Sequence, residues 1–125
     1  MRLLLDTHTL LWWLADDNNL PEAARNAIAD STNAVFVSSA SGWELSIKRS
    51  LGKLEAPDGL FNVLAEEGFE ELPIGFNDGL RAGALPMIHR DPFDRMLVAQ
   101  SQANSLTLVT KDPLIAQYGV ATLWS

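Results

Sequence analysis

The sequence predicts an α/β fold, in which helices flank a central parallel sheet of about five strands in three layers. Three observations lead to this prediction. Short apolar runs with the length of strands recur along the chain, segments with helical spacing of apolar residues separate them, and the two kinds of segment alternate. Strands that are joined through helices run parallel, because the crossover connections are right-handed and place helices on both faces of the sheet.

Two buried strands are expected in the first third of the chain. The runs RLLL at residues 2–5 and AVFV at 34–37 are short, apolar and bounded by polar residues. Between them, leucines at helical spacing predict a helix from residue 7 toward Asp16. Pro21 opens a second helix, because proline is favoured at the first helical position.

A third helix is expected at residues 38–53, directly after the second strand. Its apolar residues Leu45 and Ile47 are predicted to face the core. Gly52 marks its end, because glycine is favoured just past a helix C-terminus.

The second half of the chain continues the alternation, in the order helix, strand, short helix, long helix, strand and helix. An Asp-Pro pair begins two of these helices, since aspartate is favoured at the N-cap and proline at the next position. The elements are expected at residues 59–67, 69–74, around 80–84, 91–103, 106–110 and from 112 onward, before the final run VATLW.

Length, composition and charge limit the class of protein. The 125 residues have the size of one domain, and no linker-like stretch divides residues 1–125. The net charge of −7 argues against nucleic-acid binding through a broad basic surface. The absence of cysteine excludes disulfides and thiolate metal sites, and it favours a cytoplasmic protein. Asp6 and His8 interrupt the apolar N-terminal run, so neither a signal peptide nor a membrane span is expected.

Four acidic residues are expected to meet at one edge of the sheet. Asp6 follows the first strand, Asp112 lies two residues after the strand at 106–110, and Glu44 lies early in the helix after the second strand. Asp94 lies in the first turn of the helix that leads to the fourth strand. Ligands bind open α/β sheets beyond the carboxyl ends of the strands, which is where these acids would gather.

A divalent cation would resolve the repulsion between these carboxylates. Mg²⁺ and Mn²⁺ prefer oxygen ligands, and a site that keeps water ligands suits a phosphate substrate. Such a site can activate a water molecule and stabilise charge on a phosphodiester. The simpler interpretation is that the acids are only helix caps: Ser41 and Glu44 fit a capping box, and Asp91 and Asp112 each precede a proline.

Taken together, these motifs resemble the PIN-domain family over essentially the whole chain. The resemblance rests on Asp6 after the first strand, Glu44 in SGWELSIK, Asp94 in HRDPFDRMLVAQS and Asp112 in LVTKD. The opening MRLLLDTHTLLWWL and the DPFDR segment are similar, more narrowly, to the VapC-type toxins of bacterial and archaeal type II toxin–antitoxin pairs.

The resemblance implies a Mg²⁺- or Mn²⁺-dependent endoribonuclease that blocks translation by cutting RNA, that a cognate antitoxin silences, and that commonly forms a homodimer. It implies that Asp6, Asp94 and Asp112 bind metal directly, and that Glu44 binds or orients a second ion or its water.

The same resemblance assigns supporting positions around the acids. Asp91 is interpreted as a helix cap behind the metal ligands, and Thr110 matches a hydroxyl residue that the family often carries before its last acid. Thr7 is expected to donate a contact near Asp6.

An acidic nuclease must hold RNA with few cations. We expect four basic residues to line the entrance to the site, with Arg95 pairing with Asp91 as the alternative. These residues are Lys48, Arg49, Arg95 and Lys111.

Two adjacent tryptophans offer a surface for the antitoxin. Trp12 and Trp13 are about 100° apart around one helix, so one of them is poorly placed to reach the core. An exposed indole there, with Leu20 or Phe61 nearby, would suit an amphipathic antitoxin segment. Packing of both rings under neighbouring helices is the alternative.

Two other functions remain open from the sequence. In a small α/β phosphatase Asp6 would be the nucleophile, but a haloacid-dehalogenase-like enzyme carries a second aspartate where this chain has His8. In a non-catalytic binding module the acids would only cap helices or hold a structural cation. His8 and His89 have no partner histidine at helical spacing, so both are expected in solvent or structural roles.

Overall fold

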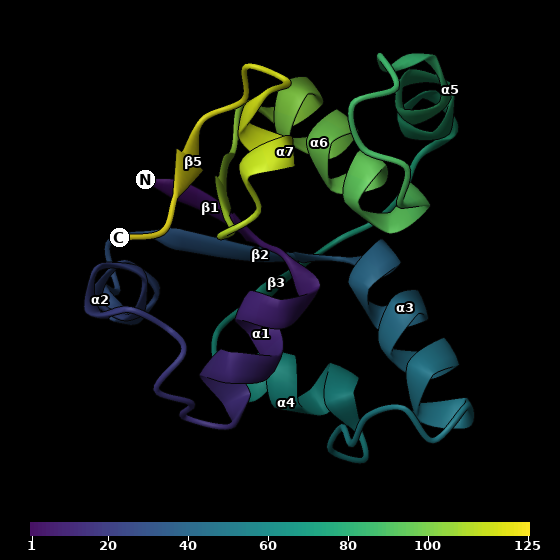
Figure 1. Cartoon of the computed structure of the whole chain (residues 1–125). Coiled ribbons are helices and arrows are strands. Elements are labelled where there is room, and N and C mark those ends of the chain that lie inside the picture. The colour runs from purple at the N-terminus through teal and green to yellow at the C-terminus, as the bar shows by residue number, and fades with distance from the viewer.

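A central strand organises the sheet. In the computed structural model, which describes residues 1–125, the strand β1 (Arg2–Leu5) pairs with β2 (Ala34–Ser38) on one side and β4 (Thr107–Val109) on the other. The edge strands are β3 (Glu70–Leu72) and β5 (Thr122–Leu123), so the order is β3-β2-β1-β4-β5 with every pair parallel. The predicted parallel sheet of about five strands is confirmed, and Figure 1 shows it crossing the middle of the molecule.

The helices cover both faces of this sheet, as the prediction of three layers requires (Figure 1). The helices α1, α2 and α4 pack on the face that carries Leu3 and Leu5, whereas α6 and α7 pack on the face that carries Leu4. The helix α3 follows β2, and α5 packs against α6. The helix bounds are α1 Thr7–Leu14, α2 Glu22–Ala29, α3 Ser39–Ser50, α4 Leu60–Glu66, α5 Phe76–Ala84, α6 Pro92–Asn104 and α7 Pro113–Ala116.

The strand leucines explain why β1 lies at the centre. Leu3, Leu4 and Leu5 are all fully buried, which requires cover on both faces of the strand, as in a parallel sheet. After β3 the chain returns across β2 and β1 to form β4, so the strand order reverses between β1 and β4. Asp6 and Asp112 follow these two strands, and the reversal point is where open α/β sheets bind ligands.

Two expectations about the middle of the chain are wrong. Leu45 is buried as predicted, but Ile47 is 37% exposed, because residues two apart on a helix point about 200° apart and only one of them faces the core. The helix α3 begins one turn earlier than a capping box at Ser41 would require. Its N-cap is Ser38, whose hydroxyl accepts a hydrogen bond from Ala40 N at 3.0 Å.

None of the helices is both long enough and apolar enough to cross a lipid bilayer.

Candidate metal centre

Helix caps bring the aspartates to the carboxyl edge of the sheet. Asp6 caps α1 through Oδ1, which accepts a hydrogen bond from Thr9 N at 2.8 Å. Asp112 caps α7 in the same way, with its Oδ1 accepting from Leu114 N at 2.9 Å. Each cap uses Oδ1, so capping a helix leaves the second oxygen of the carboxylate available for the site.

A compact cluster forms where the N-terminus of α6 meets the loop after β4. Its members are His89, Asp94 and Asp112, whose ligand atoms all lie within 4.8 Å of one another. His89 Nε2 is 2.8 Å from Asp112 Oδ2 and 3.2 Å from Asp94 Oδ2. Asp91 caps α6 through Phe93 N and Asp94 N, as expected, and thereby places Asp94 in the first turn beside the ring.

The imidazole of His89 donates to these carboxylates. The backbone N–H of Asp91 donates to His89 Nδ1 at 3.1 Å, so a neutral ring carries its proton on Nε2. The Nε2–H group therefore faces Asp112 and Asp94 as a donor. The place of His89 inside the acidic cluster was missed, and its solvent or structural role stays a prediction. The sequence signal was its position two residues before the cap Asp91.

The carboxyl group of Asp94 has a raised pKa. Burial raises the pKa of Asp94 to about 7, and the negative charge of Asp91 adds to the shift. Asp6 and Glu44 raise the pKa further, while His89 opposes them. The four predicted acids are therefore close enough to act on one another, and the carboxylates around Asp94 favour an added cation.

Glu44 is neutralised by the protein itself. Its carboxylate is buried, with Lys48 Nζ 2.7 Å from Oε2 and Thr7 Oγ1 donating to Oε1 at 2.6 Å. The expected contact of Thr7 near Asp6 thus goes to Glu44 instead. Glu44 lies beside the tight cluster and influences it through its charge.

Thr110 fixes the turn that presents Asp112. The hydroxyl of Thr110 is buried and accepts a hydrogen bond from Asp112 N at 3.1 Å. This contact holds the backbone of Asp112 in the turn after β4. Thr110 therefore supports Asp112 from the end of the strand, as expected for a position next to the last acid.

The expectation for Arg95 is wrong. Its side chain is buried, and its guanidinium donates to the carbonyl oxygens of Ala82, Leu85 and His89 at 2.9, 3.0 and 3.1 Å. Arg95 therefore ties the end of α5 and the following loop to α6. It does not line an entrance, and its hydrogen bonds go to these carbonyls instead of to Asp91.

The other three predicted cations have different surroundings. Lys48 pairs with Glu44, and Arg49 pairs with the exposed Asp58 on the outer side of α3. Lys111 lies beside the acids, with its Nζ 4.9 Å from the centre of the Trp12 ring.

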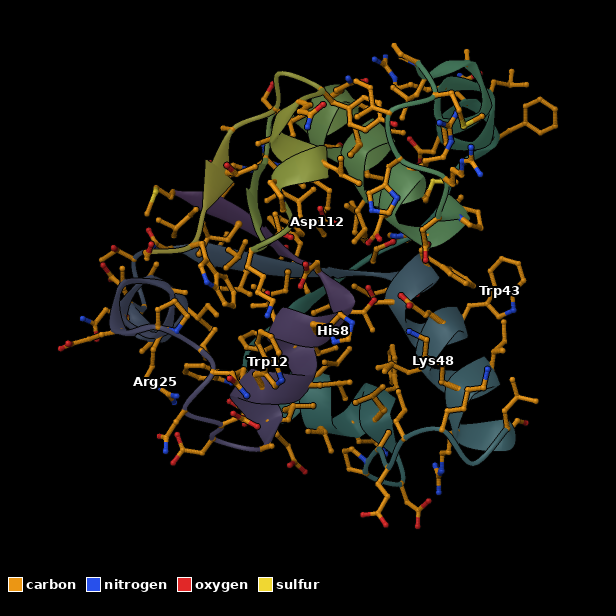
Figure 2. The ribbon with its side chains drawn as sticks, in the orientation of Figure 1. His8, Trp12, Arg25, Trp43, Lys48 and Asp112 are labelled. Carbon is orange, nitrogen blue, oxygen red and sulfur yellow. The ribbon has the colours of Figure 1, made fainter.

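A cavity of about 320 Å³ opens next to the acids. Asp6, Asp94 and Asp112 line it together with His8, Trp12, Lys111 and Trp124. Figure 2 shows His8 and Trp12 on α1 on the side toward Asp112, with Trp43 pointing away beyond α3.

The two adjacent tryptophans differ in their surroundings. Trp12 lines the cavity, whereas Trp13 packs against Phe69 at 6.2 Å between ring centres and donates from Nε1 to Glu67 at 3.2 Å. Both rings are half-buried and pack against the core cluster, so the expectation of an exposed indole is wrong and the alternative, packing of both rings, describes the structure.

The donor set fits a hard divalent cation. Carboxylate oxygens of Asp94 and Asp112 lie in one cluster, Asp6 lines the same cavity, and hard cations prefer such oxygen ligands. The pKa of Asp94 is raised mainly by burial and then by the charge of Asp91, and a bound cation would favour the charged carboxylate. These acids could therefore hold a metal ion.

Comparisons with known proteins agree with this geometry. The chain is 26% identical over 113 residues to Ribonuclease VapC22 of Mycobacterium tuberculosis (strain ATCC 25618 / H37Rv), covering 88% of this chain and 86% of that protein.

Solved structures share the fold. The chain is similar to VapBC2 from Rickettsia felis bound to a promoter DNA fragment, with a TM-score of 0.71, 18% identity and full coverage of both chains. It is also similar to DNA-bound VapBC from Salmonella typhimurium, with a TM-score of 0.71, 19% identity and coverage of 98% and 97%. A sequence model described as the PIN domain matches residues 3–121. With that match spanning almost the whole chain, and with the acids at the edge where the fold places its ligands, the chain belongs to the PIN domain family.

Proposed function

We propose that this protein is a metal-dependent endoribonuclease and the toxin of a type II toxin–antitoxin pair. The observation that carries the proposal is the group of carboxylates around Asp94, in which Asp94 and Asp112 lie in one cluster and Asp6 lines the same cavity, at the edge where an α/β sheet binds ligands. The name of the relative VapC22 as a ribonuclease supports RNA as the substrate.

The metal would be Mg²⁺ or Mn²⁺, held by Asp6, Asp94 and Asp112. When bound, such an ion polarises a phosphodiester and offsets the charge that develops on it during hydrolysis. Glu44, fixed by Lys48 and Thr7, orients water or a second ion at the border of the cluster. His89 holds the side chain of Asp112 in place through its Nε2–H donor.

Lys111 is the cation best placed to receive the phosphate backbone of the RNA, because it lines the same cavity as the acids. Lys48 lies on α3 and pairs with Glu44 at the border of the cluster, so its positive charge adds to a local attraction. Arg49 pairs with Asp58 and is not among the residues that line the cavity. This limited set fits a protein whose net charge of −7 rules out a broad basic surface.

The antitoxin would bind across α1 and α4. Phe61 is 68% exposed and lines a groove of about 300 Å³ with Leu10, Leu60 and Leu64. Trp13 borders α4 through its bond to Glu67. An amphipathic antitoxin helix suits a groove of this composition. The structural neighbours that are VapBC complexes support such a partner.

A homodimer would form through α5 and the loop after it. Phe76, Leu80 and Met87 are 85%, 60% and 72% exposed, and large exposed apolar side chains grouped on one surface are typical of an interface. The chain would work as one domain, residues 1–125, in the cytoplasm.

Cleavage of total cellular RNA by the purified protein tests the nuclease. We expect discrete fragments with Mn²⁺ or Mg²⁺ and none with EDTA or with Asp94→Asn. The matched control is Glu22→Gln, which removes an exposed acid of α2 and should cut like the wild type. Absence of cleavage by folded protein in both metals would overturn the proposal and leave a non-catalytic binding module.

A further inference from the structure

The cavity beside the metal centre has a wall made of three aromatic rings and one cation. We call His8, Trp12, Trp124 and Lys111 the aromatic wall. It faces the same space as Asp6, Asp94 and Asp112, so a ligand held by the acids would also meet these side chains.

The topology of the sheet accounts for this wall. Leu123 pairs with Val109, and Thr110 N donates to Leu123 O at 3.2 Å. Trp124, the residue that follows β5, therefore lies beside the segment that leads from β4 to Asp112. Lys111 lies in that same short connection between β4 and α7.

The first helix supplies the other half of the wall. Asp6 is the N-cap of α1, and His8 and Trp12 follow on the same face of this helix, four residues apart. Asp6, Asp112 and the residues of the aromatic wall all follow the carboxyl ends of β1, β4 and β5, while Asp94 reaches the same cavity from the first turn of α6.

Trp12 and Trp124 are half-buried and pack against the core cluster, and both also line the cavity. The Trp12 ring centre is 5.8 Å from that of His8 and 5.7 Å from that of Trp124, with interplanar angles of 40° and 52°. The tilts leave ring surface that the neighbours do not cover by parallel stacking. Lys111 Nζ lies 4.9 Å from the Trp12 ring centre, and its exposed, flexible side chain can turn to a phosphate.

We propose that the aromatic wall binds an unpaired RNA base next to the cleaved phosphodiester, with Lys111 contacting the adjacent phosphate. The proposal rests on the nuclease function above and names the kind of RNA that the site accepts. Proteins hold single-stranded nucleic acid by combining aromatic stacking surfaces with cations along the backbone, which is the combination found here.

Base pairing would prevent this contact. A base inside a duplex is covered on both faces by its neighbours, so only a loop, bulge or single strand can offer a free face to Trp12. The aromatic wall would therefore hold the unpaired base beside the cut through the ring of Trp12, which is what the variants below test.

A double-mutant cycle, which combines protein variants with abasic RNA substrates, tests whether Trp12 stacks on a base beside the cut. The substrate is a short RNA hairpin that contains a mapped cut site in its loop, and abasic nucleotides replace the residues beside the cut one at a time. Trp12→Leu keeps an apolar side chain but removes the aromatic face, and Trp12→Phe restores one. Trp43→Leu is the control for loss of an indole outside the cavity, because Trp43 is 64% exposed and its ring contacts Phe93 instead of the aromatic wall.

We expect one abasic position to lower kcat/KM of the wild type by about 10- to 100-fold. Trp12→Leu should lose a similar factor on the intact RNA and little more on that abasic RNA, while Trp12→Phe recovers most of the loss. Trp43→Leu should match the wild type. Independent, multiplying effects of Trp12→Leu and the abasic change would overturn the proposal, as would full activity of Trp12→Leu.

Two further measurements separate this inference from the function on which it rests. Quenching of tryptophan fluorescence by a single-stranded RNA hexamer in EDTA measures RNA binding at the aromatic wall when no cleavage can occur. The quenching should be weaker in Trp12→Phe and absent with a blunt RNA duplex. A wild type that cuts RNA without this quenching would overturn only the aromatic wall, and a wild type that binds the hexamer without cutting RNA in Mn²⁺ would overturn the nuclease. If Trp12→Leu changes inhibition by the antitoxin but not cleavage, the wall belongs to the protein partner and the inference is wrong.

Discussion

Asp94 and Glu44 are two acids at the same edge of one sheet, and their surroundings differ. The Glu44 side chain is 7% exposed and has protein partners on both oxygens, with Lys48 on one and Thr7 on the other. The Asp94 side chain is 24% exposed and faces the negative charge of Asp91 and other acids, with His89 as its one opposing group. One carboxylate is neutralised internally, and the other has its pKa raised to about 7.

The difference indicates where an external cation binds. Burial of a charge is costly unless a partner of opposite sign accompanies it, and Glu44 already has that partner in Lys48. Around Asp94 the partner must come from outside the chain. The α6 side of the edge is thus the expected binding centre, and the α3 side is its support.

The largest expected effect is on cleavage. Asp94→Asn removes a proposed direct metal ligand and should lower the rate by at least about 1000-fold, beyond the 10- to 100-fold loss typical of residues that only support a metal ligand. Glu44→Gln should fall within that lower range. Single-turnover cleavage of one mapped RNA measures both. Equal losses would show that Glu44 leaves Lys48 to bind the ion directly.

The next effect is stabilisation by divalent ions. A ligand at 100 times its Kd stabilises the folded state by about 2.7 kcal/mol, which Mn²⁺ should produce in thermal unfolding of the wild type and EDTA should reverse. Asp94→Asn and Asp112→Asn should lose this stabilisation. His89→Ala should retain it, because Nε2 of His89 carries a proton and acts as a donor. Loss of the Mn²⁺ effect in His89→Ala would instead make the imidazole a ligand.

The pH dependence of metal-free stability follows from the raised pKa. Asp94 has a pKa of about 7 in the folded protein against an ordinary value of 3.8, so the folded state binds more protons between these two values. Stability therefore falls as the pH rises through that window, and the full penalty applies above pH 7.

Asp94→Asn removes the penalty. In EDTA its free energy of unfolding should exceed that of the wild type by about 2 kcal/mol at pH 8, and by less at pH 5, after allowance for partial exposure of the group. Urea unfolding at the two pH values measures the difference. A gain of equal size at both would show that burial of the charge at Asp94 is not its cause.

The sequence predicted those acids that the strands position directly. Asp6 and Asp112 leave adjacent parallel strands, so alternation of strand and helix was sufficient to bring them to one edge. Arg95 was misplaced because its partners are backbone carbonyls at the end of α5 and in the following loop, and sequence spacing does not show which carbonyls lack a donor. The position of Trp124 beside Trp12 depends on strand order, which alternation alone does not determine.

The smallest expected effect concerns Glu44 and its ion pair with Lys48. Lys48→Met should destabilise the protein by about 1 kcal/mol at pH 8, because it leaves the buried Glu44 without its ion pair while the side chain of Lys48 is itself 34% exposed. Adding Glu44→Gln should recover most of this loss, since the double variant buries no unpaired charge. Lys53→Met, on the exposed turn after α3, is the matched control and should be neutral. If Lys48→Met is also neutral, the ion pair contributes nothing measurable. The contrast between Glu44 and Asp94 would then arise from their acidic neighbours alone, which Asp91→Asn would test by lowering the pKa of Asp94 with Lys48 intact.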